Sequence, residues 1–423
     1  MEIIKSYEVI FRLPRAKTNK AMEKLIIKNF GPISEVEIEI KKYTLLIGDT
    51  STGKSIIAKL ICIFKKIMQE GIEKIEDFNS LLKNYNIDFL KDDSEIEYYL
   101  DNYFVKIKGE NLIKLSDELL NIYRIKEIMQ KISFDDIIKK IGKDIELLKN
   151  DIDKEKLDTI ESQYEKAKQQ IDELRKESSF IKRYSKIIYI PAERMFFSML
   201  GKSISGLWAN NVSVSKSYLD FAGYYEVAKK NSSKVNYSDL GFTYHNNDDK
   251  EYIEYKGQKL DIQYTSSGVQ AILPLIVVLN YLAETKKDSE DSDQMICVEE
   301  PEISLFPQRQ KELVEHIVSI VNRINSWLVI TTHSPYVLSA FNNMMLASNT
   351  AKEKEERKEE IKNIISEDKW IRYEDVSAYE VKDGKVISLL DEEFKGLDVN
   401  AIDKVSDIIT EQVDQLISIR YEE

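Results

Sequence analysis

The sequence predicts an α/β fold in which a phosphate-binding loop lies between a strand and a helix. The apolar run YTLLI leads directly into GDTSTGKS at 48–55, and three more apolar runs, KIIYI, MICV and WLVI, follow after residue 183. KIIYI indicates a strand, and MICV and WLVI are typical of buried parallel strands. Because ligands of open α/β sheets lie at the carboxyl ends of the strands, the polar residues that follow these runs are the candidate site.

The first part of the chain, residues 1–65, is expected to form a β-rich lobe that ends in the phosphate loop. LIIKNF, the alternating run SEVEIEI and YTLLI all indicate strands between residues 24 and 47. Residues 1–21 are interpreted either as an added edge strand or as the product of an upstream start codon. Later in the chain, LGFTYH and EYIEYKGQKLDIQY predict antiparallel strands.

The stretch GDTSTGKS matches the pattern of a glycine, four free positions and Gly-Lys-Ser. Its two glycines let successive backbone N–H groups turn inward, and the following helix adds the positive end of its dipole. Lys54 is expected to reach the β and γ phosphates, and the Ser55 hydroxyl to bind Mg²⁺. A glycine turn with a surface lysine is the alternative. The predicted nucleotide contacts in the loop are Gly48, Asp49, Thr50, Ser51, Thr52, Gly53, Lys54 and Ser55.

Residues 66–182 are rich in lysine and glutamate and predict a helical insertion. Two apolar series spaced 3, 4, 3, 4 run from Ile138 to Ile152 and from Leu157 to Leu174. The step of five between them predicts two antiparallel helices that turn near Asp153. A projecting coiled-coil hairpin and a helical bundle packed on the core are both compatible with this pattern. Residues 183–423 are expected to return to the α/β core.

The amino-acid composition argues against two classes of protein, those that coat nucleic acid and those that span a membrane. The formal charge of −13 argues against a protein that coats nucleic acid, because phosphate neutralisation needs a basic surface. No run approaches eighteen apolar residues, so no membrane span or membrane partner is predicted. Two cysteines, Cys62 and Cys297, are expected to be reduced core thiols, which fits a cytoplasmic location.

Three motifs follow the insertion. In MICVEEPE, Glu299 is placed to hold Mg²⁺ through water and Glu300 to polarise an attacking water, although a solvated strand end is the alternative. In YTSSGVQ, Ser267 and Gly268 start an apolar helix and predict an anion-binding end, with an ordinary serine N-cap as the alternative. His333, in VITTHSP, ends the next apolar run.

The order and spacing of these motifs resemble the ABC-type ATPase heads of SMC-like DNA-repair proteins and of the OLD (overcoming lysogenization defect) family. The resemblance is greatest to the ATPases of bacterial phage-defence systems of the Septu and PARIS type, in which YIPAER, SSG, EEPE and THSP recur. It implies an ABC-type head, with a mixed sheet around the phosphate loop and an antiparallel β lobe, interrupted by the helical insertion. It covers nearly the whole chain apart from residues 1–21 and much of the insertion.

The resemblance also implies a head-to-head homodimer, or a higher homo-oligomer, that holds two ATP molecules between its heads. Lys54, Ser55, Glu299, Glu300 and His333 would act on the nucleotide of their own subunit, with Lys54, Glu300 and His333 in the catalytic roles. Ser267 and Gly268 would contact the γ-phosphate of the partner's nucleotide.

Several positions depart from the family pattern. Thr50 and Thr52 replace the usual asparagine and small residue, Glu299 replaces aspartate, and Phe306 stands where histidine is common. No glutamine loop is evident. Glu193 and Arg194 take its place by position, which makes Arg194 a predicted nucleotide contact, with a structural salt bridge as the alternative.

The predicted function is that of a Mg²⁺-dependent ATPase that regulates a separately encoded effector, such as a nuclease, in anti-phage defence. The residues after His333 show no nuclease pattern of their own. A DNA-repair or DNA-tethering ATPase with a direct DNA contact is the alternative, and a non-hydrolysing scaffold is a third hypothesis.

Overall fold

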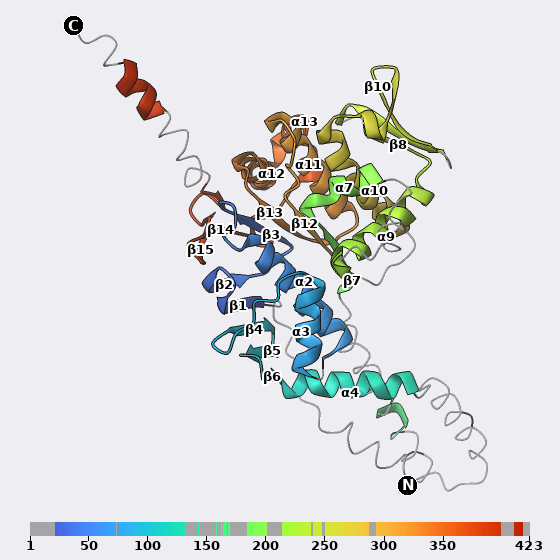
Figure 1. Cartoon of the computed structure of the whole chain (residues 1–423), viewed down its shortest axis with the longest axis vertical. Coiled ribbons are helices and arrows are strands. Elements are labelled where there is room, and N and C mark those ends of the chain that lie inside the picture. The colour runs from blue at the N-terminus through green and yellow to red at the C-terminus, as the bar shows by residue number, and fades with distance from the viewer. Residues whose placement is uncertain are drawn as a thin grey trace.

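The computed structural model describes residues 22–131 except 73, single positions between 143 and 169, residues 184–200, residues 214–286 except 238–239 and 248–249, residues 293–398, and residues 410–417. The expected edge strand at 1–21 and the expected helical turn near Asp153 lie outside the described residues. The predicted α/β class is confirmed by the arrangement of sheets and helices (Figure 1).

The centre of the molecule is a six-stranded sheet in the order β15-β14-β3-β13-β12-β7. Neighbouring strands are parallel from β14 to β7, and only β15 is antiparallel to its neighbour. MICV and WLVI are therefore buried parallel strands, as predicted, and the strand predicted at KIIYI is parallel to them. The strands are β3 (Tyr43–Ile47), β7 (Tyr184–Ile190), β12 (Asp293–Glu299), β13 (Trp327–Thr332), β14 (Val376–Lys382) and β15 (Lys385–Ser388).

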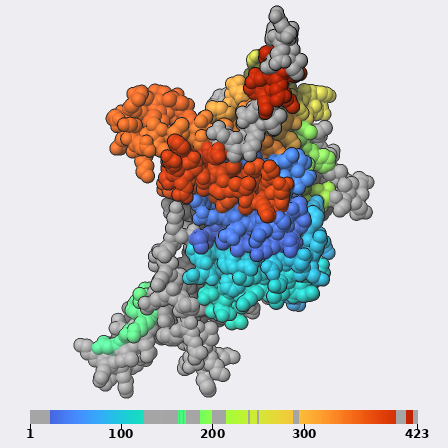
Figure 2. All heavy atoms as spheres, turned by 90° about the vertical axis from the view of Figure 1, so that its left-hand side faces the viewer, coloured from blue at the N-terminus to red at the C-terminus, as the bar shows by residue number. Residues whose placement is uncertain are grey.

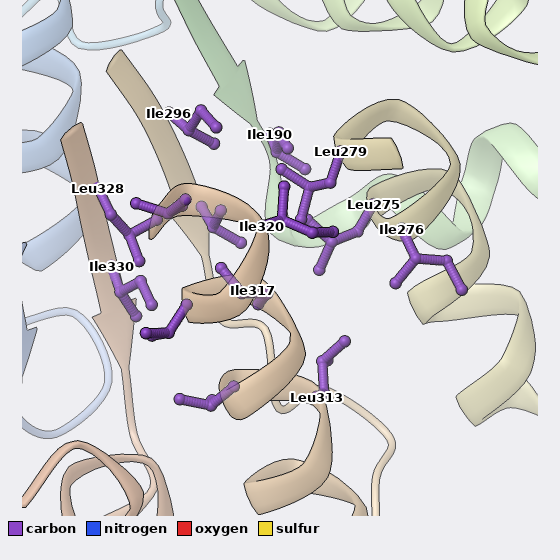
Figure 3. Packing of buried hydrophobic residues seen from close by; sticks show 14 of the residues in the cluster. Ile190, Leu275, Ile276, Leu279, Ile296, Leu313, Ile317, Ile320, Leu328 and Ile330 are labelled. Carbon is purple, nitrogen blue, oxygen red and sulfur yellow. The ribbon is translucent and has the colours of Figure 1, made fainter. Parts of the chain in front are cut away.

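Alternate residues of these strands enter two separate hydrophobic cores. Leu45, Ile296 and Ile330 belong to the core that covers one face, whereas Leu46 and Cys297 belong to the core on the other. Figure 3 shows residues of α10 and α11 packed against the first face. The helices of that side are α9 (Lys216–Asn231), α10 (Ser267–Thr285), α11 (Pro307–Arg323) and α12 (Pro335–Glu353).

Helix α2 (Lys54–Glu70) and a five-stranded antiparallel sheet enclose the second core, in the order β2-β1-β4-β5-β6. This lobe lies against the C-terminal strands, where the backbone N–H groups of Ser34 and Glu35 donate to the carbonyl of Gly384 (Figure 2). Its elements are β1 (Glu23–Phe30), β2 (Ile33–Glu39), α3 (Ile75–Asn84), β4 (Glu95–Leu100), β5 (Tyr103–Lys108), β6 (Leu112–Leu115) and α4 (Asp117–Lys131).

The expectation of an entirely helical segment at 66–182 is therefore wrong for β4, β5 and β6. In EIEYYL and YFVKIK buried residues alternate with partly or fully exposed ones, and Ile96, Tyr98, Val105 and Ile107 are among the buried residues. A period of two places such residues on one face of a strand. The lysines and glutamates that suggested helix instead pair across the solvent face of the sheet, as Lys106 does with Glu97.

A four-stranded antiparallel sheet packs beside the start of α10, with the order β11-β10-β9-β8. It confirms the antiparallel strands predicted for LGFTYH and EYIEYKGQKLDIQY. The remaining elements are α7 (Met195–Leu200), β8 (Lys234–Tyr237), β9 (Phe242–Asn247), β10 (Lys250–Tyr255), β11 (Gln258–Asp261), α13 (Lys358–Ile364), β16 (Leu390–Asp391), β17 (Gly396–Leu397) and 3-10 turns at Ala192–Arg194, Ile262–Tyr264, Glu355–Arg357, Glu367–Lys369 and Tyr373–Asp375.

Helix α10 is the one helix among the described residues that is long and apolar enough to cross a membrane. It lies between α7, α9 and α11, and 72% of its most apolar window is buried in the protein. Burial of this extent is what a core helix of a folded domain shows.

A buried ion pair joins the antiparallel lobe to α2. The Lys65 ammonium contacts the Glu23 carboxylate, and both side chains are almost fully buried. Tyr98 donates its hydroxyl to the same carboxylate at 2.7 Å, and the ammonium also lies 5.0 Å from the Trp327 ring centroid. The pair therefore links β1, α2, β4 and β13.

We predict that Glu23→Ala lowers the free energy of unfolding by about 3–5 kcal/mol, because it leaves the Lys65 charge buried without its carboxylate. Urea denaturation would measure the change. The matched control is Glu37→Ala, whose ion pair with Lys24 is half exposed and whose loss should cost less than about 1 kcal/mol. Equal losses in the two variants would contradict the structural importance of the buried pair.

Candidate nucleotide-binding site

The loop at 48–53 adopts a backbone that requires glycine at both ends. Gly48 has a φ of 155°, and a Cβ atom there would lie 2.2 Å from the carbonyl oxygen of Val381 on β14. Gly53 has a φ of 107° and immediately precedes α2. The loop therefore turns tightly at the carboxyl end of β3 and directs the chain into the helix, as the sequence motif predicts.

Lys54 is the first residue of α2, and its side chain folds back over the loop. The ammonium donates to the carbonyls of Gly48 at 3.0 Å and Asp49 at 2.6 Å. Burial lowers the pKa of Lys54, whereas four nearby carboxylates favour its charged form, with Glu300 contributing most. Lys54 is therefore close to the acidic residues that end β12. The other three carboxylates are those of Asp49, Glu302 and Glu299.

Glu299 is the last residue of β12 and is 4% exposed. Burial raises the pKa of Glu299, and the Lys59 charge and the adjacent Ser55 hydroxyl oppose the rise. One carboxylate oxygen, Oε1, is buried and accepts no hydrogen bond from the described residues. Ser55 and Glu299, predicted together as Mg²⁺ ligands, are thus brought side by side from α2 and β12.

Glu300 and His333 face each other across the ends of β12 and β13. Oε1 of Glu300 lies 3.2 Å from Nε2 of His333, and both side chains are partly exposed. Glu300 has a φ of 44°, in the left-handed region, and its backbone N–H donates to the carbonyl of Thr331 at 2.9 Å. This backbone turns the Glu300 side chain out of the strand and towards the edge where His333 lies.

Arg194 does not have the role that its sequence position predicted. Its guanidinium is completely buried and donates to five backbone carbonyls at 2.7–3.2 Å, so all five N–H donors are used within the protein. The predicted nucleotide contact is therefore wrong for this structure, and Arg194 instead fixes the backbone. The acceptors are Pro191, Ala271, Glu299, Glu300 and Pro301.

Glu193, the other residue proposed in place of a glutamine loop, is exposed and accepts a hydrogen bond from the Tyr218 hydroxyl. Its charge acts on Glu299, so it lies near the same acidic edge. Glu193 is therefore the member of this pair that stays accessible from solvent.

Ser267 and Gly268 are the first two residues of α10 and lie far from the phosphate loop in the sequence. Ser266 is the N-cap and accepts weakly from the N–H of Val269 at 3.4 Å, and Ser267 is exposed. A Cβ on Gly268 would lie 2.9 Å from the Ser304 carbonyl oxygen. Together with the four-stranded sheet, these residues line a cavity of about 500 Å³.

Sequence reasoning missed Glu302 and Gln310. Glu302 accepts hydrogen bonds from Thr332 and from the backbone N–H of His333, and Gln310 accepts one from Ser334. The sequence held a signal for Glu302, which is the fourth residue of EEPE. A third glutamate so soon after the strand end needs a hydrogen-bond partner of its own. Gln310 lies in an ordinary amphipathic helix and offered no such signal.

The model of the AAA ATPase domain family matches residues 65–338, which is more than half of the chain. The chain belongs to this family. The matched span includes Glu193, Ser267, Gly268, Glu299, Glu300 and His333, and begins after the phosphate loop. This AAA ATPase is thereby placed among nucleotide-binding proteins, as the phosphate loop predicts.

The AAA ATPase is also similar to solved SMC heads, all at low identity. A Smc head domain from Pyrococcus furiosus, with an extended coiled coil and bound to the C-terminal domain of ScpA, is 11% identical with a TM-score of 0.35, and the match covers 92% of this chain and 100% of that one. A Smc head bound to the C-winged helix domain of ScpA is 12% identical with a TM-score of 0.38, covering 88% and 98%. The SMC head domain from Thermotoga maritima is 13% identical with a TM-score of 0.33, covering 75% and 91%.

A search of curated proteins finds no match for the AAA ATPase.

We predict that Arg194→Met lowers the free energy of unfolding by on the order of 3 kcal/mol or more, because several buried carbonyls lose their donors. Arg194→Lys should recover only part of this loss, since an ammonium has three donors and no planar fork. Chemical denaturation would measure both. Arg372→Met is the control, because the Arg372 side chain is 73% exposed and forms a surface ion pair with Asp375. Weaker nucleotide binding at unchanged stability would contradict the backbone role.

Proposed function

We propose that the protein is a Mg²⁺-dependent ATPase whose site lies at the carboxyl ends of β3, β12 and β13. The observation that carries this proposal is the convergence of Lys54, Glu300 and His333 at that edge, from elements far apart in the sequence. Three adjacent parallel strands end there, which is where open α/β sheets bind their ligands.

The residues would divide the chemistry among them. The N–H groups of the loop and the start of α2 would bind the phosphates, and Lys54 would neutralise charge on the β and γ phosphates. Glu300 would orient and polarise the attacking water, while His333, 3.2 Å away, would hold Glu300 and the γ-phosphate in register. Positioning and charge stabilisation are the main contributions that phosphoryl transfer needs from a protein.

Ser55 and Glu299 fit a magnesium ion that is shared with the nucleotide. A hydroxyl and a buried carboxylate with an unbonded oxygen are hard oxygen donors of the kind Mg²⁺ prefers. The described residues hold no cluster of three or more histidine, cysteine, aspartate or glutamate side chains suited to a metal, so phosphates and water would complete the coordination. Held by Ser55 and Glu299, such an ion would supply positive charge that offsets the negative charge of the phosphates.

In this proposal two heads dimerise around ATP, with Ser267 and Gly268 of one subunit contacting the nucleotide of the other. The exposure of Ser267 at the start of a 19-residue helix supports this role, because the N–H groups and dipole of that helix end favour an anion. ATP would then bind the engaged state more tightly than the separate heads, and hydrolysis would release them.

The proposed biological role is regulation of a separately encoded effector, such as a nuclease, in cytoplasmic anti-phage defence. The sequence motifs shared with phage-defence ATPases support it. DNA repair or tethering is the second candidate role. It is favoured by the similarity of the head motifs to SMC-like proteins and opposed by the net charge of −13.

We predict that Glu300→Gln lowers kcat for ATP hydrolysis by about 10²–10³-fold while ATP binding is retained, because the amide cannot polarise the water as the carboxylate does. Lys54→Ala should abolish ATP binding as well as hydrolysis. Steady-state phosphate release and fluorescent-nucleotide titration would separate the two effects. Glu312→Gln, on the surface of α11, is the control and should behave as wild type. Unchanged hydrolysis in Glu300→Gln would favour the non-hydrolysing scaffold.

We also predict that Glu300→Gln protein, purified with ATP and Mg²⁺ alongside its operon neighbours, forms a stable dimer that retains an effector. Native mass spectrometry would give the stoichiometry, and Ser267→Arg should abolish the dimer without loss of nucleotide binding. Recovery of a dimer that carries only DNA, with salt-dependent stimulation of hydrolysis, would instead support the repair role.

A further inference from the structure

Glu302 is a buried carboxylate that the proposed chemistry does not use. It lies in the turn after β12, is 8% exposed, and directs Oε1 towards the neighbouring loop after β13. That oxygen accepts two hydrogen bonds, from the backbone N–H of His333 at 2.7 Å and from the Thr332 hydroxyl at 2.8 Å. The second oxygen, Oε2, is buried and bonds to none of the residues that the structure describes.

These bonds fix the loop that carries His333. Because the Thr332 hydroxyl donates to Glu302, it is free to accept, and it accepts from the backbone N–H of Ser334 at 3.0 Å. The Ser334 hydroxyl in turn donates to Gln310 and caps the start of α12 through the N–H of Tyr336. Each of the three residues from Thr332 to Ser334 is thus held through its backbone, its side chain or both.

Strand pairing does not require Glu302. β12 and β13 are already joined along their length, up to the pair Glu299 and Thr331, and the N–H of Glu300 continues the ladder. A buried acid with an unbonded oxygen is a costly way to secure two strands that are already paired. Burial raises the pKa of Glu302, which reflects this cost. The Glu302 carboxylate also favours the charged form of the buried Arg194, which is a contribution to stability, and its two bonds to the loop after β13 add a contribution to position.

We infer that Glu302 is a positioning residue for ATP hydrolysis, which holds the His333 backbone so that the imidazole stays within reach of Glu300. This inference rests on the proposed function. Glu302 acts on His333 through its hydrogen bond to the backbone N–H, whereas the imidazole of His333 faces Glu300. A displacement of about 1 Å in such a group can cost about 10²-fold in rate, whereas nucleotide binding depends mainly on the phosphate loop.

The test compares Glu302→Met, which removes both acceptors, with Glu302→Gln, which keeps an acceptor oxygen. We expect Glu302→Met to lower kcat by about 10–100-fold with KM for ATP and fluorescent-nucleotide affinity within about twofold of wild type. Glu302→Gln should retain kcat within about threefold, because the amide oxygen can still accept from His333 and Thr332. Thr332→Val is a second, nearly isosteric variant that removes one of the two donors and should give a smaller loss of kcat.

A double-mutant cycle with His333→Ala separates positioning from general destabilisation. If Glu302 acts through His333, Glu302→Met should cost little further kcat in the His333→Ala background. The inference would be overturned if Glu302→Met and His333→Ala lowered kcat by independent, multiplicative factors. It would also be overturned if folded Glu302→Met or Thr332→Val protein had a wild-type kcat. Hydrolysis by the wild-type protein is measured first. Its absence would overturn the proposed function itself, whereas normal wild-type hydrolysis with an unaffected Glu302→Met variant overturns only the role of Glu302.

Discussion

The geometry of the site depends on the hydrogen bonds of the buried Arg194 guanidinium. One guanidinium joins the loop after β7, the first turns of α10 and the end of β12. Burial lowers the pKa of Arg194 to about 10, and the carboxylates around it, led by Glu302, oppose the change, so the group is still charged at neutral pH. Its rigid fork of five N–H donors matches five fixed carbonyls at once, whereas an ammonium has only three donors. The helix that begins at Ser267 and the strand end that carries Glu299 are thereby held together.

The two-sided core explains why the polar residues gather where they do. Along β3, β12 and β13, alternate side chains pack into one hydrophobic core or the other, and no charged residue lies between the ends of these strands. Glu299 and Glu302 lie at the end of β12 or just beyond it, and each keeps one buried oxygen that accepts no hydrogen bond from the part of the chain that the structure describes. Proteins usually satisfy such atoms, and exceptions concentrate at functional positions. The left-handed backbone of Glu300, beside them, adds a local strain of the same kind.

The loop after β13 connects this acidic edge to the rest of the head. His333 contacts Glu300 through its ring and Glu302 through its backbone, so the three residues form one bonded unit across two strand ends. Through Ser334 and Gln310 the same unit reaches α11, and the Gln310 amide donates to the carbonyl of Leu305. Leu305 and Ser304 in turn pack against Gly268. The two proposed halves of the nucleotide site are therefore connected through contiguous contacts within one subunit.

The sequence by itself determined the phosphate loop, the parallel strands and the strand-end positions of Glu299, Glu300 and His333, because each follows from local pattern. The sequence predicted helix where β4, β5 and β6 form, because these segments are rich in lysine and glutamate. The partners of these side chains across the sheet are evident only in the tertiary structure. Only the tertiary structure decided that Arg194 holds the backbone and that Glu302 holds His333. The physical reason is distance along the chain: Arg194 bonds to residues up to 107 positions away and Glu302 to a residue 31 away. No local periodicity encodes such partners, which burial and packing select only when the sheet and both cores are assembled.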